Sequence, residues 1–202
     1  MHQENNVSPA EALQILIEGN KRFVAENSIH PNTDKNRRNE VLNCQIPFAV
    51  ILSCSDSRVP PEVIFDRGIG DLFVIRVAGN IYSSVVKASI MLAVKHLECP
   101  LVVVMGHSSC SAVSMCFEKS EIFTEESHYI KKIIKMIRSN IPEALSMISD
   151  KDKKIEFAIK ENVKSIAANL SKEKLIVSRI AKGKTIIKPA LYSNESGKVS
   201  WL

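Results

Sequence analysis

Two apolar runs in this sequence each end in residues that can bind a metal or hold a proton. The first run, 50–53, is followed by three of them at every second position: Cys54, Asp56 and Arg58. The second run, 101–105, is followed closely by two more: His107 and Cys110. Apolar runs without alternation are typical of strands buried on both faces of a parallel sheet. The carboxyl ends of such strands meet at one edge, so we expect the two clusters to form one metal site.

The types of donor in these clusters favour zinc. Structural zinc sites use four protein ligands, whereas catalytic sites use three and keep the fourth position for water. The clusters supply three ligands: Cys54, His107 and Cys110. A lone cysteine or histidine at a strand end is usually an ordinary core residue, and only the pairing of the two clusters favours a metal. Asp56 is the local candidate for a fourth ligand, which leaves a structural zinc as the alternative.

The acid and the base beside Cys54 favour the catalytic alternative. An arginine that grips a carboxylate lowers the pKa of that carboxylate and fixes its orientation. Asp56 paired with Arg58 would then accept a hydrogen bond from a zinc-bound hydroxide without taking its proton. The competing interpretation is an ordinary surface ion pair, which contributes little to stability. Because the pair lies so close to a candidate metal ligand, we favour the catalytic interpretation.

The composition is that of a globular chain in a reducing environment. The chain has 202 residues, 45% of them hydrophobic, which is enough for one domain with its own core. Its five cysteines show no disulfide framework, and the absence of a Cys-x-x-Cys motif argues against a redox protein. We therefore expect a cytoplasmic protein, or a periplasmic one if a signal peptide was removed before this numbering.

Charge and hydropathy argue against two classes of partner. The net charge is +5, but acidic residues are interleaved with the basic ones and only 5% of residues are aromatic. A nucleic-acid surface would combine basic residues with stacking platforms, so we expect no nucleic-acid partner. No run approaches the roughly 18 apolar residues of a membrane span, so we expect no membrane association.

The elements around the clusters predict an α/β fold with a mostly parallel central sheet flanked by helices. Ser8, Pro9 and Glu11 form a helix start that opens an N-terminal helical arm, residues 1–45. The polar part of this arm, 28–43, is expected to cross the surface or to lie on another subunit. Strands at 48–53, 72–77 and 101–105 alternate with helices, as right-handed parallel crossovers do.

The rest of the α/β core, residues 46–202, is expected to end in two paired strands. The chain after Cys110 is expected to be mostly helical to about Leu170. A strand at 185–192 follows, and Pro189 within it predicts an edge position. A turn and a last strand then form a C-terminal β-hairpin at the sheet edge. Neither a repeat nor a second domain is evident, so we expect residues 1–202 to form a single domain.

With their surroundings, the two clusters resemble a known family. The segments 54–58 and 106–110 are similar to the paired signature motifs of beta-class carbonic anhydrases. The similarity continues through further segments that together span most of the chain: 11–13, 18–23, 59–62, 70–80 and 197–199. Because the paired motifs are specific, the chain is identified as a member of this family from its sequence.

The resemblance implies reversible hydration of carbon dioxide to bicarbonate and a proton. A zinc-bound hydroxide would attack the carbon, with one Zn²⁺ per chain. Three residues match the family's zinc ligands: Cys54, His107 and Cys110. Asp56 and Arg58 match its dyad, which orients the nucleophile. In some members the aspartate itself ligates zinc in a closed, inactive state, and Asp56 could do the same if Arg58 released it.

The resemblance also implies a substrate site shared between subunits. The residues that match pocket positions of the family are Gln45, Phe73, Ala78 and Ser111. In plant-like members the glutamine and the phenylalanine reach the zinc of the neighbouring subunit, which implies a homodimer or homotetramer. Ser111 departs from the usual glycine, although its backbone N–H could still reach an oxyanion.

Other departures leave alternatives to carbon dioxide hydration open. Met91 and Leu92 replace a frequent acidic or amide residue and an aromatic residue, and Ile51 replaces the tryptophan of members with a non-catalytic bicarbonate site. A related zinc hydrolase of carbon disulfide or carbonyl sulfide is one alternative. A catalytically silent zinc-binding homologue is another, although intact Asp56 and Arg58 favour an enzyme.

Overall fold

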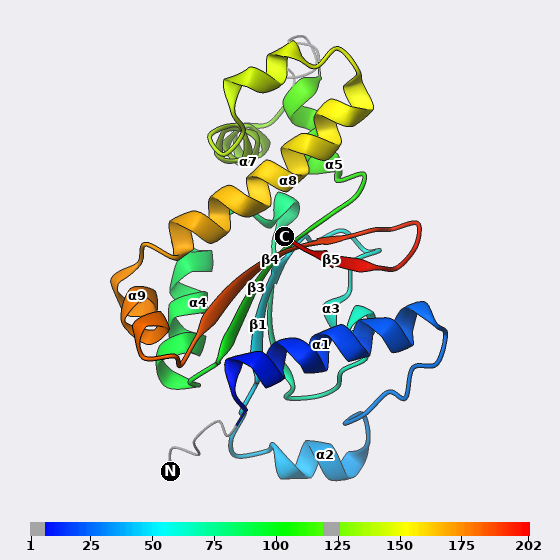
Figure 1. Cartoon of the computed structure of the whole chain (residues 1–202), viewed down its shortest axis with the longest axis vertical. Helices are drawn as coiled ribbons and strands as arrows, with labels where there is room; N and C mark the ends of the chain where they lie inside the picture. Colours follow the sequence, from blue (N-terminus) through cyan, green and yellow to red (C-terminus); the bar gives the residue numbers. More distant parts are fainter. Residues whose placement is uncertain (1–6, 119–125) are drawn as a thin grey trace.

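The computed structural model describes residues 7–118 and 126–202, and it is built around a five-stranded sheet (Figure 1). The strands are β1 (Ala49–Ser53), β2 (Leu72–Arg76), β3 (Leu101–His107), β4 (Ile186–Tyr192) and β5 (Val199–Trp201). Their order is β2-β1-β3-β4-β5. All neighbouring pairs are parallel except β4 and β5, which form an antiparallel hairpin. The expected α/β fold with a mostly parallel sheet and a C-terminal hairpin is confirmed.

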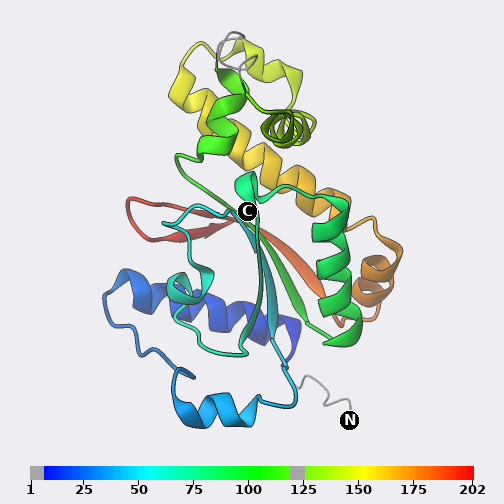
Figure 2. The same cartoon turned by 180° about the vertical axis from the view of Figure 1, so that it is seen from behind.

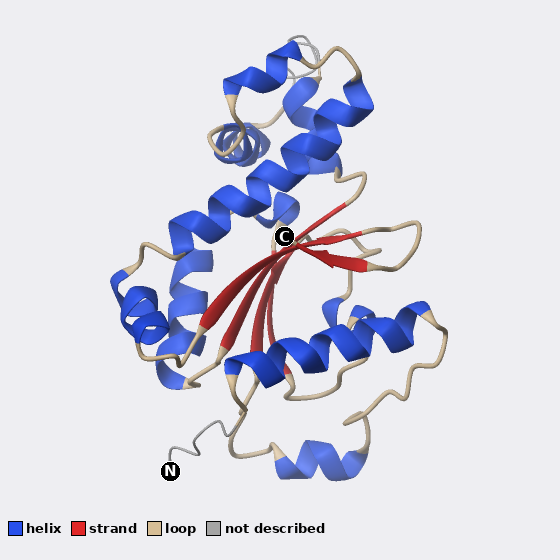
Figure 3. Cartoon of the chain, in the orientation of Figure 1, coloured by secondary structure: helices blue, strands red, loops and turns tan. Residues whose placement is uncertain are grey.

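Strands β1 and β3 form the centre of the molecule because both of their faces are apolar. Every residue of the two strands is buried. Alternate side chains enter two cores, so that Ala49 and Ile51 pack on one side while Val50 and Leu52 pack on the other. This double burial explains the apolar runs without alternation in the sequence. Helices cover both faces of the sheet (Figure 3).

Helix α1 (Pro9–Val24) covers the first face together with α3 (Pro61–Ile64). Ser8 and Glu11 close a reciprocal capping box at the start of α1, as expected from the sequence. The apolar side of α1 buries Ala12 and Leu16 completely. Gly19 lets the helix approach closely, because a Cβ there would lie 1.8 Å from the carbonyl oxygen of Phe65.

The opposite face is covered by α4 (Ser84–His96), α8 (Lys151–Leu170) and α9 (Lys174–Ala181), seen from behind in Figure 2. Ser83 caps α4 and Asp150 caps α8 through their side-chain oxygens. Helix α8 is long enough to serve two cores. Its second half packs on the sheet through Val163 and Ile166, and its first half packs elsewhere through Ala158 and Ile159.

A third core lies beyond the carboxyl ends of the strands. It gathers around α7 (His128–Arg138), α5 (Ser111–Ser114) and the first half of α8, in the upper part of Figure 1. Ile134 and Ile137 of α7 are buried in it, beside Cys54 and Cys110. The short turns η1 (Ala78–Asn80), η2 (Met115–Phe117) and η3 (Glu143–Met147) complete this region. Helices therefore cover the carboxyl ends of the central strands.

Several local expectations differ from the structure. Pro189 was expected on an edge strand, but β4 lies between β3 and β5. The proline is tolerated because its nitrogen and its carbonyl oxygen face the same side of the strand. On that side β5 has ended, and the N–H of Leu202, which follows β5, donates to the carbonyl of Pro189 at 3.0 Å.

Two helical segments also differ from expectation. The polar stretch 28–43 contains a short helix, α2 (Lys35–Glu40), whose first turn is capped by the Asp34 side chain. The helix expected after Cys110 consists of α5 and the turn η2, and residues 119–125 of the expected helical region lie outside the described residues. In the described ranges, no helix combines the length and the apolar character needed to span a bilayer.

Candidate metal centre

The candidate ligands come from the ends of two neighbouring strands. Cys54 directly follows β1, and His107 is the last residue of β3. The parallel register pairs Leu52 with Val104, so the two strand ends lie side by side. Cys110 occupies the N-cap position of α5, one turn after His107. Adjacent parallel strands thus bring together groups that are distant in the sequence.

The ligand atoms of Cys54, His107 and Cys110 all lie within 4.8 Å of one another. All three residues are buried, with exposed fractions of 5%, 0% and 1%. A tetrahedral zinc with two thiolate ligands and one imidazole would hold its ligand atoms roughly 3.5–3.8 Å apart, so the donor set fits such an ion. Among residues 7–118 and 126–202, this is the group of three that meets the geometric requirement for a metal.

The protonation pattern of His107 leaves one nitrogen free for a metal. Its Nδ1 lies 2.9 Å from the carbonyl oxygen of Ser108, which can only accept, so Nδ1 carries the hydrogen. Its Nε2 is buried and has no hydrogen-bond partner among the described residues. A buried nitrogen without a partner is costly, and a metal ion would satisfy it.

The two thiols interact, and their pKa values shift in opposite directions. The pKa of Cys54 is lowered, mainly by hydrogen bonding with the thiol of Cys110 and further by the backbone N–H groups of Asp56 and Gly79. The pKa of Cys110 is raised, because its interaction with Cys54 and its own burial both favour the protonated thiol. Cys54 is therefore the group that first carries negative charge. A cation bound between the sulfurs would replace the proton of Cys110.

Asp56 lies beside the cluster but is held by Arg58. Its two carboxylate oxygens accept hydrogen bonds from Nε and Nη2 of Arg58 at 2.9 and 2.7 Å. These bonds hold the pKa of the Asp56 carboxyl well below its usual range. Asp56 Oδ2 lies 3.9 Å from Nε2 of His107, so the carboxylate faces the ligand group without belonging to it.

Sequence reasoning missed residues that shape the loop around Cys54. The N–H of Gly79 donates to Cys54 Sγ at 3.3 Å. Gly79 has a positive φ of 64°, and a Cβ there would lie 2.6 Å from the end of the Ile137 side chain, so any other residue would be strained and would displace Ile137. Arg76 donates to the backbone oxygens of Cys54 and Asp56 at 3.1 and 2.6 Å. A glycine shortly after the end of β2 was the available signal for Gly79, and nothing local marked Arg76.

The predicted pocket residues fall into two groups. Ala78 lies in η1 next to Gly79, and Ser111 follows Cys110 at the start of α5, so both adjoin the ligand group. Phe73 is paired with Val50 at the opposite end of the sheet, and Gln45 is exposed before β1 begins. At about 3.3 Å per residue, Val50 is some 13 Å from Cys54, so Phe73 and Gln45 do not reach the cluster of their own chain.

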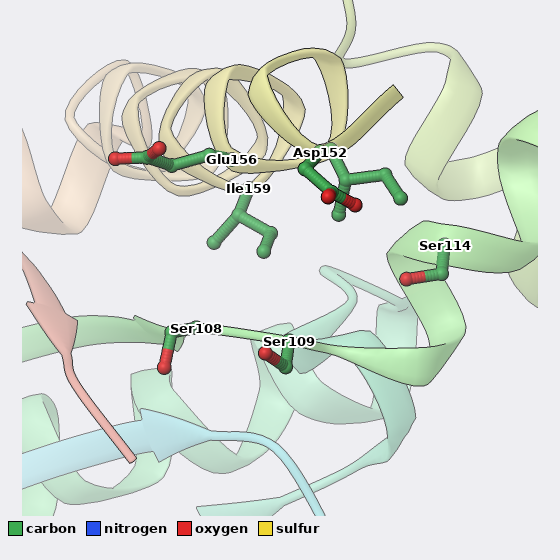
Figure 4. A pocket seen from close by; sticks show the side chains of 7 residues that line it. Ser108, Ser109, Ser114, Asp152, Glu156 and Ile159 are labelled. Carbon is green, nitrogen blue, oxygen red and sulfur yellow. The ribbon is translucent and has the colours of Figure 1, made fainter. Parts of the chain in front are cut away.

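A cavity of about 400 Å³ borders the loop between His107 and Cys110 (Figure 4). Ser108, Ser109 and Ser114 form one wall, and α8 forms the other with Asp152 and Glu156 among its residues. None of the three candidate ligands lines this cavity. It therefore lies beside the ligand loop and is distinct from the space that the sulfurs and the imidazole enclose.

Comparison with known sequences points to one family. The carbonic anhydrase family model matches residues 49–199. Carbonic anhydrase 2 of Mycobacterium tuberculosis is 35% identical over 197 residues, which cover 96% of this chain and 92% of that protein. The carbonic anhydrase of Mycolicibacterium smegmatis is 39% identical over 136 residues, or 67% of this chain and 66% of that protein.

Solved structures give the same result. The beta-carbonic anhydrase CcaA has a TM-score of 0.75 and 27% identity, covering 94% of this chain and 91% of its own. A tetrameric beta-carbonic anhydrase of Sordaria macrospora has a TM-score of 0.74 and covers 94% of this chain and 96% of its own; at 22% identity it supports the fold alone. Because sequence relatives and structural neighbours agree along nearly the whole length, the chain belongs to the beta-class carbonic anhydrase family.

Proposed function

We propose that this chain catalyses the reversible hydration of carbon dioxide to bicarbonate and a proton, with one Zn²⁺ per chain held by Cys54, His107 and Cys110. The observation that carries the proposal is the convergence of three donor atoms within 4.8 Å at the strand ends of a carbonic anhydrase family member. The bound zinc would lower the pKa of a water molecule and so supply a nucleophile near neutral pH.

Asp56 and Arg58 are the proposed catalytic dyad. Arg58 engages both oxygens of Asp56, so the carboxylate stays ionised and its direction is held. An ionised carboxylate accepts a hydrogen bond from the attacking oxygen. That bond aims a lone pair of the oxygen at the carbon of the substrate, and the low pKa of Asp56 keeps it from removing the proton.

The backbone around Cys54 supports this role by stabilising the thiolate. The N–H of Gly79 donates to Cys54 Sγ, which draws negative charge away from the sulfur. The carbonyl oxygen of Gly79 accepts from the buried Asn162 side chain at 3.2 Å, and Asn140 in turn donates to Asn162 at 2.9 Å. This chain of hydrogen bonds ties the η1 turn to α8, so the donor to Cys54 stays in place.

We further propose that the complete site forms between two copies of the chain. Gln45 and Phe73 are too far from their own Cys54 to contact a substrate there, and the resemblance assigns both to the neighbouring subunit's site. A homodimer or a homotetramer would supply them. Ala78 and Ser111 adjoin the ligand group within the chain and are proposed to line the same pocket.

Replacing Gln45 tests the shared site. Gln45→Ala is expected to lower kcat/KM about tenfold, the effect of one lost hydrogen bond to the substrate, without changing zinc content or oligomer size. Asn43→Ala is a matched control, because Asn43 is exposed in the same loop. Equal stopped-flow rates for the Gln45 variant and the control would remove Gln45 from the site.

The state of the cysteines supports a reducing compartment. All five are free thiols in the structure, and three of them are buried together with no disulfide: Cys54, Cys110 and Cys116. Thiolate ligands must remain reduced to hold a metal. We therefore propose that the protein works in the cytoplasm.

A stopped-flow hydration assay on zinc-loaded protein tests the proposed function. Zinc at one per chain together with carbon dioxide hydration well above background is the expected result. Stoichiometric zinc without hydration would instead identify a silent zinc-binding homologue. Turnover of carbon disulfide or carbonyl sulfide without carbon dioxide hydration would identify the related hydrolase.

A further inference from the structure

The turn between β4 and β5 contacts the loop that carries two of the candidate ligands. Asn194 lies in this turn, and its backbone N–H donates to Ser108 Oγ at 2.9 Å. The N–H of Ser108 donates to the carbonyl oxygen of Tyr192 at 2.9 Å. The hairpin thus fastens the backbone directly after His107 by two hydrogen bonds that do not depend on the Asn194 side chain.

The side chain of Asn194 adds a third contact with a different consequence. Its Nδ2 donates to the carbonyl oxygen of Ser108 at 2.8 Å. The same oxygen accepts the hydrogen of His107 Nδ1 at 2.9 Å. Two donors therefore converge on one carbonyl, which explains why Nδ2 of Asn194 and Nδ1 of His107 lie 3.4 Å apart without bonding to each other. A carbonyl oxygen has two lone pairs, and here both are used.

This convergence determines which nitrogen of His107 is available to bind a metal. The Ser108 carbonyl keeps the hydrogen on Nδ1, so the lone pair is on Nε2, the buried nitrogen without a partner in the described structure. The carbonyl belongs to a loop, and the carboxamide of Asn194 holds it in line with the ring. Oδ1 of Asn194 is itself buried and unpaired within the described residues, so the side chain is anchored mainly through its donor.

We propose that Asn194 is a positioning residue for His107: through the Ser108 carbonyl it fixes the tautomer and the direction of the imidazole that binds the metal. The inference rests on the proposed function only in that a metal binds at this group. Partners of this kind, one step removed from the metal, typically change its affinity by about 10–100-fold when they are removed.

The test is the affinity for Zn²⁺, measured by competition with a chromophoric chelator. Asn194→Leu keeps the branched shape of the side chain but loses the donor, and its dissociation constant for Zn²⁺ is expected to rise about 10–100-fold. Ser193→Ala is the control, because Ser193 Oγ accepts from Ser196 N–H at 3.1 Å and its loss loosens the same turn without touching Ser108. The control is expected to keep the wild-type affinity.

A second readout separates positioning from folding. The melting temperature of each metal-free protein reports the stability of its fold, and its rise on adding Zn²⁺ reports the metal affinity. For Asn194→Leu the rise is expected to be smaller than for Ser193→Ala. If Asn194→Leu does not fold, Asn194→Ala removes the same donor with a smaller side chain and is expected to bind zinc equally weakly.

The outcomes distinguish this inference from the proposed function. Wild-type affinity in a folded Asn194 variant would overturn the role of Asn194 and leave the proposed enzyme intact. An equal loss of affinity in the Ser193 control would also overturn it, because a loosened hairpin would then be sufficient. A wild-type chain that binds no zinc would overturn the inference and the proposed function together.

Discussion

Two aspartate–arginine pairs in this molecule have the same chemistry and opposite surroundings. Asp66 binds Nε of Arg22 at 2.6 Å, and its side chain is fully buried. Asp56 binds Nη2 of Arg58 at 2.7 Å, but the Arg58 side chain is 52% exposed. Asp66 also accepts the backbone N–H groups of Ile29 and His30 at 3.2 and 2.9 Å. One pair is part of the scaffold, and the other faces the candidate metal centre.

The separation of the partners along the chain explains the difference. Arg22 and Asp66 are 44 positions apart, so their contact forms only when α1 and the loop after α3 are packed together. Asp56 and Arg58 are two positions apart and can meet before the chain folds. A pair that already exists in the unfolded chain adds little to folding. The Asp56–Arg58 pair can therefore take part in catalysis while contributing little to the stability of the fold.

The largest expected effect comes from breaking the scaffold pair. Asp66→Ala removes the acceptor of Arg22 and of two backbone N–H groups, and we expect it to lower the free energy of unfolding by about 3 kcal/mol. Urea denaturation followed by circular dichroism measures this change. Asp56→Ala is the matched control, with an expected loss below about 1 kcal/mol. Equal losses for the two variants would abolish the distinction between the pairs.

The next effect comes from the pair at the candidate metal centre and concerns rate. Asp56→Asn keeps the shape of the side chain but removes its charge, and we expect kcat for carbon dioxide hydration to fall about 100-fold or more. Zinc content and the urea midpoint should stay close to those of the wild type. Unchanged turnover would exclude Asp56 from the mechanism, and lost zinc would mean that it acts as a ligand.

The third and smallest effect is a difference between the two pairs in how the free energy of unfolding depends on pH. The pKa of Asp66 is lowered: burial alone would raise it, but Arg22 and the two backbone donors outweigh burial. A lowered folded-state pKa contributes stability that is present above the unfolded value of about 3.9 and is lost as pH falls through the folded value. The stability difference between wild type and Asp66→Asn should therefore be constant from pH 7 to 5 and shrink below about pH 4.

Urea titrations at pH 7, 5 and 3.5 measure that difference. A gap that widens on acidification would contradict a lowered pKa for Asp66. The same series on Asp56→Asn is expected to show a much smaller change, because Arg58 is only two positions away and lowers the pKa of Asp56 in the unfolded chain as well.

Local sequence patterns were sufficient to predict the elements that matter most for the site. The apolar runs before Cys54 and His107 predict buried parallel strands, and such strands end at a common edge. The helix start at Ser8 was also predictable, because a capping bond is made within one turn. These features follow from residues that are neighbours in the sequence, so local patterns identify them.

The residues that support the ligands are identified by contacts between segments that are distant in the sequence. Gly79, Asn162 and Asn194 act on Cys54 and His107 across long stretches of chain, and no local pattern marks such contacts. The edge position expected for Pro189 was wrong for the same reason. Whether β4 has a neighbour on each side depends on β5, whose residues lie outside β4. The residue types identify the possible metal-binding groups, and the order and packing of the strands determine which of these groups meet.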